Sequence, residues 1–324
     1  MTLLISMLED YNEAQFPLVI HYNEKMLQLF SDDQPSWMKG VNELLLKHGA
    51  ILFRGFPVSC VDAFESFVSA SSGSGSWMEY PDEKATPRSS VKNKIMTSTE
   101  YHAQGAIYLH NECCHRKSWP QQLYFCCHQP AREGGATPVA AIRGVTNAVE
   151  QDLGELFRQR GARYLRNYGG HYGANLCYSF GTEDPEAIES YCEAAGLNWQ
   201  WMGKGQLRTI AEFPAYRLHP QTREALWFNN IAFYHRTTIE PRFARLLAQV
   251  PSEDLAFASY FGDGEPIADN IIHQLRVAYD RYTTRFIWQT GDVLLVDNML
   301  CAHARDPYKG PRTTWVAMAK EIHS

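Results

Sequence analysis

Short apolar segments, separated by Gly, Pro and Asn, make up much of the chain from about residue 106 onward. They are rich in Val, Ile, Tyr and Phe, which favour pleated strands. We expect strands at 50–53, 106–110, 122–127, 136–142, 225–230, 285–289, 292–298 and 313–322. Many short strands with turn residues between them are typical of an antiparallel barrel or jelly roll.

Helical periodicity marks a second set of segments. The stretch 36–48 has helical spacing and is followed by Gly49, which suits the end of a helix. Further helices are expected at about 144–160, 185–195, 236–249 and 268–282. Because these lie between the two halves of the strand set, we predict a single domain over 1–324, mainly β with α. It comprises a helical and strand part at 1–100 and a double-stranded β-helix (jelly-roll, cupin-like) core with a helical insert at 101–324.

Small polar residues at Ser69–Ser76 predict a mobile loop. Trp77, Met78 and Tyr80 follow it and carry enough apolar area to cover a small pocket. We therefore hypothesise that the segment 69–101 is a lid that becomes ordered when substrate binds. The alternative is a surface connection remote from the site.

Composition narrows the class of protein. With 324 residues, 45% hydrophobic and 20% charged, the chain can bury a core as an ordinary soluble globular protein does. The net charge of -6 is spread along the sequence, and no basic stripe for nucleic acid is visible. We see neither a signal peptide nor the roughly 18 apolar residues of a membrane span, so we expect a cytoplasmic protein. Its eight cysteines form no C-x-x-C pair, which favours reduced thiols.

The sequence His110-Asn111-Glu112 ends one of the predicted strands. Residues i and i+2 of a strand point to the same face, so His110 and Glu112 can bind one ion together. His303 is the natural third ligand, after a turn at Gly291-Asp292 and a short apolar strand. Two imidazoles and one carboxylate leave three positions open on a metal, which suits iron(II) and oxygen. The H-x-E pattern is weak by itself, since a His with a Glu two residues on is common.

Three further motifs give the H-x-E pattern its weight. They are G-G-x-T-P at 134–138, G-D-V-L-L-x-D-N at 291–298 and H-x-R-x-P-Y-x-G-x-R at 303–312. With them, the chain resembles the taurine dioxygenase superfamily of iron(II)- and 2-oxoglutarate-dependent oxygenases. The resemblance is to the branch in which clavaminate synthase and amino-acid hydroxylases carry Glu in the H-x-E, and it covers about 51–322.

The resemblance implies a role for each matching residue. His110, Glu112 and His303 match the iron(II) ligands. Thr137 and Arg312 match the pair that holds the distal carboxylate of 2-oxoglutarate. The chemistry agrees, because a guanidinium binds a carboxylate through two parallel hydrogen bonds and a hydroxyl adds one more donor.

One spacing departs from the family pattern. Arg312 lies nine residues after His303, closer than in the better-known members. Arg305 therefore stays a candidate for the same role. We prefer Arg312, because it opens the final predicted strand and can point into the barrel.

Rival chemistries are weaker. Cys113, Cys114 and His115 could form a zinc cluster with His110, but a second, separated pair of ligands is missing. Glu112 fills a position that is small in the halogenases of the superfamily, so halogenation is not expected. A metal-dependent hydrolase has no use for a carboxylate clamp. A non-catalytic binding protein on the same barrel would be free to lose either the clamp or the ligands.

Ser98, Thr99 and Glu100 are candidate substrate contacts, because relatives that hydroxylate amino acids use polar side chains near this position. An ordinary strand edge is the alternative, and 166–168 and 227–230 are weaker candidates. The resemblance implies an enzyme that uses O2 and 2-oxoglutarate, releases succinate and CO2, and hydroxylates an amino acid or an amino-acid-derived biosynthetic intermediate. Desaturation, cyclisation and N-oxidation stay open, as do a carrier-bound substrate and the oligomeric state.

Overall fold

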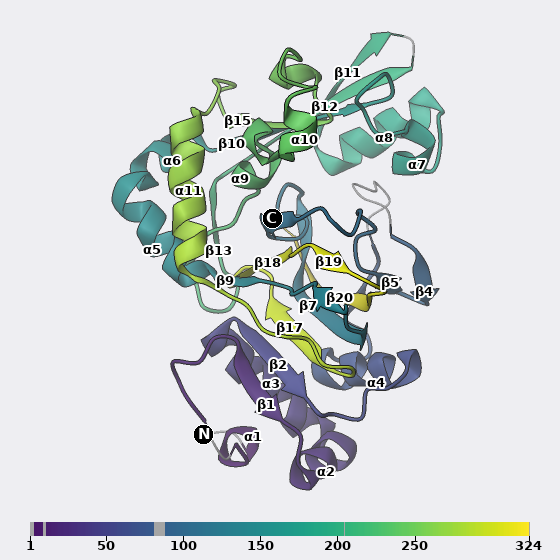
Figure 1. Cartoon of the computed structure of the whole chain (residues 1–324), viewed down its shortest axis with the longest axis vertical. Helices are drawn as coiled ribbons and strands as arrows, with labels where there is room; N and C mark the ends of the chain where they lie inside the picture. The colour runs from purple at the N-terminus through teal and green to yellow at the C-terminus, as the bar shows by residue number, and fades with distance from the viewer. Residues whose placement is uncertain (1–2, 9–10, 81–87, 204, 324) are drawn as a thin grey trace.

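The computed structural model describes residues 3–8, 11–80, 88–203 and 205–323 (Figure 1). A large sheet lies at its centre, and β1 and β2 at one edge of this sheet are parallel whereas the other neighbours are antiparallel. In order of pairing its strands are β1 (Leu18–His21), β2 (Ala50–Arg54), β17 (Val293–Asp297), β7 (Ser118–Gln129), β20 (Thr313–His323), β5 (Ile95–Thr97) and β4 (Ser90–Lys92), with β3 (Trp77–Met78) beside β20.

A smaller sheet shares an apolar core with the large one, through residues such as Val139 and Cys301. Its strands are β16 (Thr283–Thr284), β9 (Val139–Ala141), β18 (Cys301–Arg305) and β6 (Ile107–His110). The short strands β8 (Glu133–Gly134) and β19 (Tyr308–Lys309) form a separate two-stranded sheet. Together the sheets form the double-stranded β-helix core, as the strand pattern predicts.

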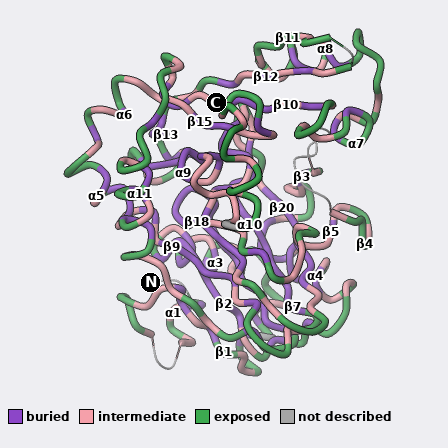
Figure 2. The backbone as a smooth tube through the Cα atoms, turned by 45° about the horizontal axis from the view of Figure 1, so that its top comes forward, coloured by how far each residue is buried: buried purple, intermediate pink, exposed green. Residues whose placement is uncertain are grey.

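The central strands of the large sheet (β2, β17, β7 and β20) are buried on both faces over most of their length, which explains their near-continuous apolar runs. Along β7, Tyr124 and Cys126 pack toward the N-terminal helices, whereas Leu123 and Phe125 pack toward the smaller sheet. This alternation follows from the two-residue period of a strand. Figure 2 shows these central strands as buried.

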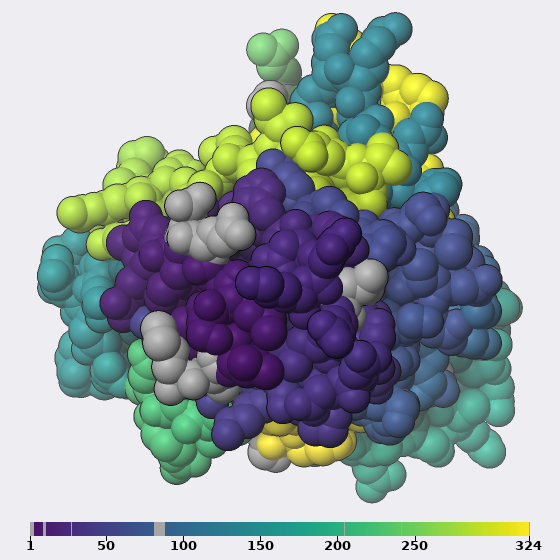
Figure 3. Space-filling view, turned by 90° about the horizontal axis from the view of Figure 1, so that it is seen from below, coloured from purple at the N-terminus to yellow at the C-terminus, as the bar shows by residue number. Residues whose placement is uncertain are grey.

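Helices of the N-terminal part cover the outer face of the large sheet, and Figure 3 shows the face of the molecule that this part forms. They are α1 (Leu3–Ser6), α2 (Glu24–Asp32), α3 (Gln34–His48) and α4 (Val61–Ser72). The predicted helix at 36–48 is confirmed as α3, and Gly49 ends it with a φ of 78° in the left-handed region.

The insert lies above the jelly roll in Figure 1. Its strands are β10 (Ala162–Tyr168), β11 (Asn198–Gly203), β12 (Gln206–Phe213), β13 (Tyr216–Leu218), β14 (Ala225–Trp227) and β15 (Phe257–Phe261). Its helices are α5 (Ile142–Asp152), α6 (Gly154–Arg160), α7 (Leu176–Phe180), α8 (Pro185–Ala195), α9 (Ile231–Tyr234), α10 (Pro241–Ala244) and α11 (Asp269–Arg281), with 3-10 turns at Arg236–Thr238 and Ser252–Asp254. The predicted helices at 185–195 and 268–282 are confirmed, and the one at 144–160 is divided at Leu153.

Two predicted elements are wrong. Only a 3-10 turn and α10 form within 236–249, because Pro241 can begin a helix but cannot continue one. The stretch 285–289 connects two strands instead of forming one, and its apolar character comes from Trp288, which is buried in the core between the sheets. Within the described residues, no helix has both the length and the hydropathy that crossing a bilayer requires.

The expected lid also needs correction. Ser69–Ser72 belong to α4, where the buried Ser71 hydroxyl accepts a hydrogen bond from the Trp37 indole at 3.1 Å. Trp77 and Met78 pair with β20 in the large sheet and line neither of the two cavities beside His110, whereas Tyr80 does line the larger of them. The middle of the proposed lid, 81–87, lies outside the described residues.

Candidate metal centre

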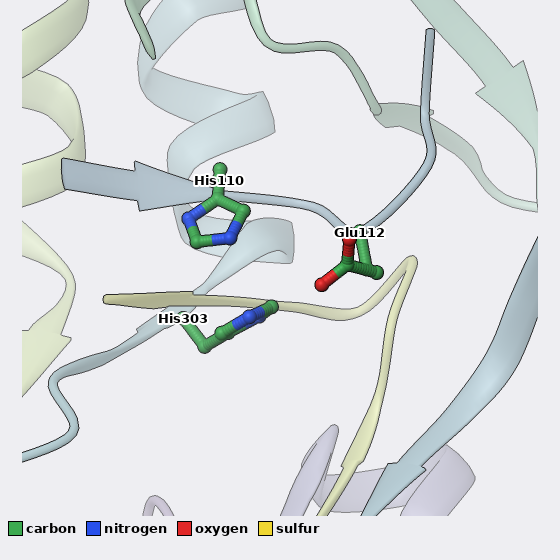
Figure 4. A group of neighbouring side chains, drawn as sticks. All are labelled: His110, Glu112 and His303. Atoms are coloured by element: carbon green, nitrogen blue, oxygen red, sulfur yellow. The ribbon is translucent and has the colours of Figure 1, made fainter. Parts of the chain in front are cut away.

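Three side chains converge beside the smaller sheet. β6 and β18 are antiparallel neighbours, and His110 lies directly opposite His303 in their register. The centroids of the two imidazoles are 4.3 Å apart. One possible ligand atom from each of His110, Glu112 and His303 lies within 4.8 Å of the other two, and Figure 4 shows this group. It is the only such group of His, Cys, Asp or Glu side chains in the part of the chain that the structure describes.

Glu112 approaches this site from a turn. β6 ends at His110, and Cys113 has a φ of 57° in the left-handed region. Asn298 fixes the turn, since its Oδ1 accepts the Glu112 N–H and its Nδ2 donates to the Glu112 carbonyl, both at 2.8 Å. The two side chains do converge, as expected. The expected cause is wrong, because Glu112 lies outside the strand and strand alternation cannot align it with His110.

Buried amides tie this turn to the rest of the core. The Asn111 N–H donates to Asn230 Oδ1 at 3.1 Å, and Asn230 Nδ2 donates back to the Asn111 carbonyl at 3.2 Å. Asn111 Nδ2 also donates to the Asn298 carbonyl at 2.6 Å. Sequence reasoning missed the role of Asn298, although its place after a buried strand in the G-D-V-L-L-x-D-N motif was an available signal. Asn230, a weak substrate candidate, supports Asn111.

Asn298→Ala is expected to weaken metal binding by about 10–100-fold, because residues that orient a metal ligand typically contribute this much. Asn298→Asp keeps the acceptor for the Glu112 N–H but sets a buried carboxylate oxygen against the Glu112 and Pro120 carbonyls, so its loss should be at least as large. Titration of the apoprotein with Mn(II) measures the affinity, and thermal unfolding with a chelator measures any loss of fold separately. Wild-type affinity in Asn298→Ala would contradict the orienting role.

His219 and Asp297 form a buried pair behind the site. Backbone N–H groups of Gln221 and Thr222 donate to His219 Nδ1 at 3.2 and 3.0 Å. The proton of this imidazole therefore lies on Nε2, which donates to Asp297 Oδ2 at 3.1 Å. Asp297 Oδ1 accepts the N–H of Met299 at 2.9 Å and shapes the turn that leads into β18. His219 is thus structural and lies outside the ligand set.

His219→Ala is expected to lower the free energy of unfolding by about 2–3 kcal/mol, because a buried carboxylate loses one of its hydrogen-bond donors. Urea unfolding should show a lower midpoint with an unchanged slope. The matched control is His273→Ala, since His273 is exposed on α11. Equal midpoints for the two variants would show that the pair does not stabilise the fold.

The electrostatics of the site suit a divalent metal. Burial lowers the pKa of His110 and lowers the pKa of His303 further, so both imidazoles are neutral near pH 7. Burial alone would raise the pKa of Glu112, but the charge of Arg88 and the hydrogen bond that Arg88 donates lower it, and this pKa lies below its ordinary value. Metals bind these same protonation states.

The nitrogen atoms of the two imidazoles point to the same conclusion. His110 Nδ1 lies 2.8 Å from the Tyr108 carbonyl and donates to it, which leaves Nε2 available as a ligand atom. His303 Nδ1 is buried and has no hydrogen-bond partner among the described residues. A carboxylate and two imidazoles, with ring nitrogens that lack hydrogen-bond partners among the described residues, fit an iron(II) ion.

Arg312 and Thr137 lie together in a small cavity beside the two histidines, with a volume of about 30 Å³. Arg312 Nη2 lies 3.4 Å from Thr137 Oγ1, and its Nε donates to the Gly135 carbonyl at 3.1 Å. Thr137 also accepts a hydrogen bond from the Trp288 indole at 3.1 Å. The guanidinium keeps donors directed into the cavity, where a carboxylate can receive them.

Arg305 lines the same cavity but directs its donors elsewhere. Its Nη atoms donate to the carbonyls of Tyr101, His102 and Gly105 at 2.8–2.9 Å, and one of them lies 3.4 Å from the Thr99 carbonyl. These contacts fix the backbone of 99–105. The geometry therefore favours Arg312 over Arg305 as the residue available to a ligand.

The three candidate substrate contacts lie in different places. Ser98 lines the small cavity, with its hydroxyl 3.5 Å from Arg312 Nη1. Thr99 lines both the small cavity and a larger one on the other side of the histidines. Glu100 lines neither of the two, and its carboxylate accepts hydrogen bonds from Ser89 and Thr97. The structure gives Glu100 no contact with the site.

The larger cavity has a volume of about 480 Å³ and lies between the jelly roll and the insert. Arg88 stands where the two cavities meet and donates to Glu112 Oε2 at 2.8 Å. Phe233 of α9 stacks on His110, with the ring centroids 4.8 Å apart. Sequence reasoning missed both residues, because neither belongs to a motif and each reaches the site from a segment distant in sequence.

The rival zinc cluster is not formed. Cys113 and Cys114 are buried in the core under the insert. The ring of His115 packs against Tyr164 and Tyr234, and burial lowers its pKa to about 3. These side chains serve packing, and His115 also lines the larger cavity.

Comparison with known proteins identifies the family. Residues 23–318 match the family described as taurine catabolism dioxygenase TauD, TfdA family. The dapdiamide synthesis protein DdaC of Enterobacter agglomerans is 34% identical over 284 residues, which cover 87% of this chain and 85% of DdaC. A clavaminate synthase-like protein of Arabidopsis thaliana is 27% identical over 330 residues, with 96% of each chain covered.

A solved structure confirms the fold. The crystal structure of PvcB from Pseudomonas aeruginosa superposes with a TM-score of 0.54 at 14% identity, covering 94% of this chain and 85% of PvcB. At this identity the likeness concerns the fold alone. The family match and the 34% identity to DdaC, together with the convergent His-x-Glu and His, show that the chain belongs to the TauD/TfdA family of iron(II)- and 2-oxoglutarate-dependent dioxygenases.

Proposed function

We propose that this dioxygenase binds iron(II) through His110, Glu112 and His303, and 2-oxoglutarate through Thr137 and Arg312. The observation that carries the proposal is the position of the Arg312 guanidinium in a cavity that the two histidines also line. A metal at the histidines and a cation at Arg312 match the two ends of 2-oxoglutarate. Arg312 and Thr137 would then hold the distal carboxylate, while His110, Glu112 and His303 would hold the metal at the other end of the co-substrate.

The chain's own residues bind the metal and the co-substrate, orient them, and exclude water from the site. Iron(II) with 2-oxoglutarate supplies the oxygen activation, with release of succinate and CO2. Arg312 sets the orientation of the co-substrate through its fixed fork of donors. Asn298 holds Glu112 in place, and Phe233 covers one face of His110. Phe125 and Val316 give the small cavity an apolar wall.

We further propose that the substrate is an amino acid or an amino-acid-derived biosynthetic intermediate, which enters the larger cavity and is hydroxylated. The printed names of the relatives support this, since one is a dapdiamide synthesis protein and another is clavaminate synthase-like. Thr99 is the candidate contact that lines the cavity. Desaturation, cyclisation and N-oxidation would use the same site. The proposal places the enzyme in the cytoplasm, where its cysteines would stay reduced.

The test is a screen for substrate-dependent succinate release. Protein with iron(II), ascorbate and 2-oxoglutarate is incubated with free amino acids, their acylated derivatives and biosynthetic intermediates, and succinate and product are measured together. The proposal expects at least one compound to raise succinate release and to gain an oxygen atom. Arg312→Ala is the control, because succinate that it still releases does not come from co-substrate bound at Arg312. Failure of wild type to bind 2-oxoglutarate in the presence of iron(II) would refute the assignment.

A further inference from the structure

Arg88 is a buried cation with a single carboxylate partner. Its side chain is 5% exposed and contacts Glu112, and no other described carboxylate lies within 4.0 Å of its guanidinium. Its Nε is buried without a hydrogen-bond partner among the described residues. The Tyr80 ring lies 4.9 Å from the guanidinium carbon. The guanidinium therefore depends on Glu112 for its charge balance.

Metal binding removes most of that balance. Once Glu112 coordinates a divalent ion, its charge is shared with the metal. The charges of the ion and the 2-oxoglutarate dianion cancel, and Arg312 would pair with the distal carboxylate, so Arg88 would keep only the part of the Glu112 charge that the metal leaves. A buried charge without a partner is strongly unfavourable, so the loaded site favours one more anionic group near Arg88.

The larger cavity is the place from which that group can come. Arg88 lines it, and the small cavity on the other side is the proposed place of 2-oxoglutarate. The other charged side chains of the larger cavity already have partners. Glu240 contacts the Tyr101 hydroxyl at 2.6 Å and His102 Nε2 at 2.8 Å, and Arg236 donates to the Ser252 hydroxyl at 3.0 Å.

Polar groups such as Thr99 and Asn230 also line the larger cavity, but most of its exposed lining is apolar and much of that comes from the insert. The apolar residues include Phe233, Ile239, Phe243, Leu247, Leu255 and Phe257. The cavity thus pairs one buried cation beside the metal with a long apolar surface. A ligand of matching chemistry carries an anionic group at one end and an apolar body at the other.

We propose that the larger cavity binds a substrate whose carboxylate pairs with Arg88 and whose apolar body lies along Phe233 and Phe257. This inference rests on the proposed function, because it assumes that metal and 2-oxoglutarate occupy the site beside it. Arg88 then exchanges partners, from Glu112 in the empty site to the substrate in the loaded one. Such an exchange couples substrate binding to prior loading of metal.

The experiment uses protein loaded with Mn(II) and N-oxalylglycine, an unreactive analogue of 2-oxoglutarate. Saturation with this analogue keeps carboxylate probes out of the small cavity. The probes are N-acetyl-L-phenylalanine and its carboxamide, which share an apolar body and differ in charge. Calorimetric titration gives both dissociation constants. We expect wild type to prefer the carboxylate by at least about tenfold, as for a hydrogen-bonded charged pair.

Three variants test whether Arg88 causes the preference for the carboxylate probe over its carboxamide. Arg88→Gln should reduce the preference to about one, and Arg88→Lys should restore part of it because the charge returns. Arg236→Gln, at the same cavity, should keep it. Thermal unfolding of each loaded variant shows whether a loss reflects the fold.

Each contrary outcome has a separate meaning. If the analogue does not bind to the Mn(II) protein, the proposed function fails and this inference falls with it. If the analogue binds but wild type binds neither probe or does not distinguish them, this inference alone is wrong. It is also wrong if Arg88→Gln weakens the analogue tenfold and leaves the probe preference unchanged, since Arg88 would then serve the co-substrate.

Discussion

His303→Ala is expected to lower the affinity for iron(II) by at least about 100-fold and to abolish succinate formation. Residues that merely orient a metal ligand contribute about 10–100-fold, so loss of a ligand atom should cost no less. The fold should survive, because His303 borders a cavity and its Nδ1 has no partner among the described residues. Iron content after gel filtration and anaerobic titration measure the loss.

Two further variants complete this test. His273→Ala changes an exposed histidine on α11 and should keep wild-type iron content. Glu112→Ala removes the carboxylate that Arg88 contacts and should behave like His303→Ala. Full iron content and normal product formation in Glu112→Ala would show that the ligand assignment is wrong.

The sequence predicted which side chains converge better than it predicted the structure around them. His110, Glu112 and His303 are recognisable because iron chemistry restricts the residue types, and the motif around Arg312 restricts the chain near it. The turn that carries Glu112 was missed, since it depends on Asn298, which follows β17 and is 186 residues away in sequence. Arg88 was missed for the same reason, as its pairing with Glu112 arises only when the chain folds.

Secondary structure shows the same division. Helix α3 follows from helical periodicity, and the middle of β7 follows from the apolar run at 122–127, so local sequence was enough to predict both. An apolar run cannot tell a strand from a buried connection, so Trp288 suggested a strand at 285–289 where the structure has none. The run at Ser69–Ser76 suggested a mobile loop, because small residues alone do not reveal that Ser71 is buried against Trp37.

Arg312→Ala is expected to weaken 2-oxoglutarate binding by roughly 30-fold to several thousand-fold, the equivalent of losing a buried charge pair worth about 2–5 kcal/mol. Binding of substrate should change far less, because Arg312 lines the small cavity and is absent from the lining of the larger one. The absorption band of the anaerobic iron(II)–2-oxoglutarate complex follows the titration. Arg312→Lys should recover only part of the loss, since a lysine keeps the charge but cannot form the two parallel hydrogen bonds.

Arg305→Ala is the decisive comparison for this prediction. Arg305 is 6% exposed and donates to backbone carbonyls of 99–105, so its removal should mainly lower stability and loosen that segment. Any loss of 2-oxoglutarate affinity should be smaller than in Arg312→Ala and should accompany a lower unfolding midpoint. If Arg305→Ala showed the larger loss of affinity at an unchanged midpoint, the carboxylate would pair with Arg305. We would then conclude that an arginine nine residues after His303 is too close in sequence to serve as the carboxylate partner.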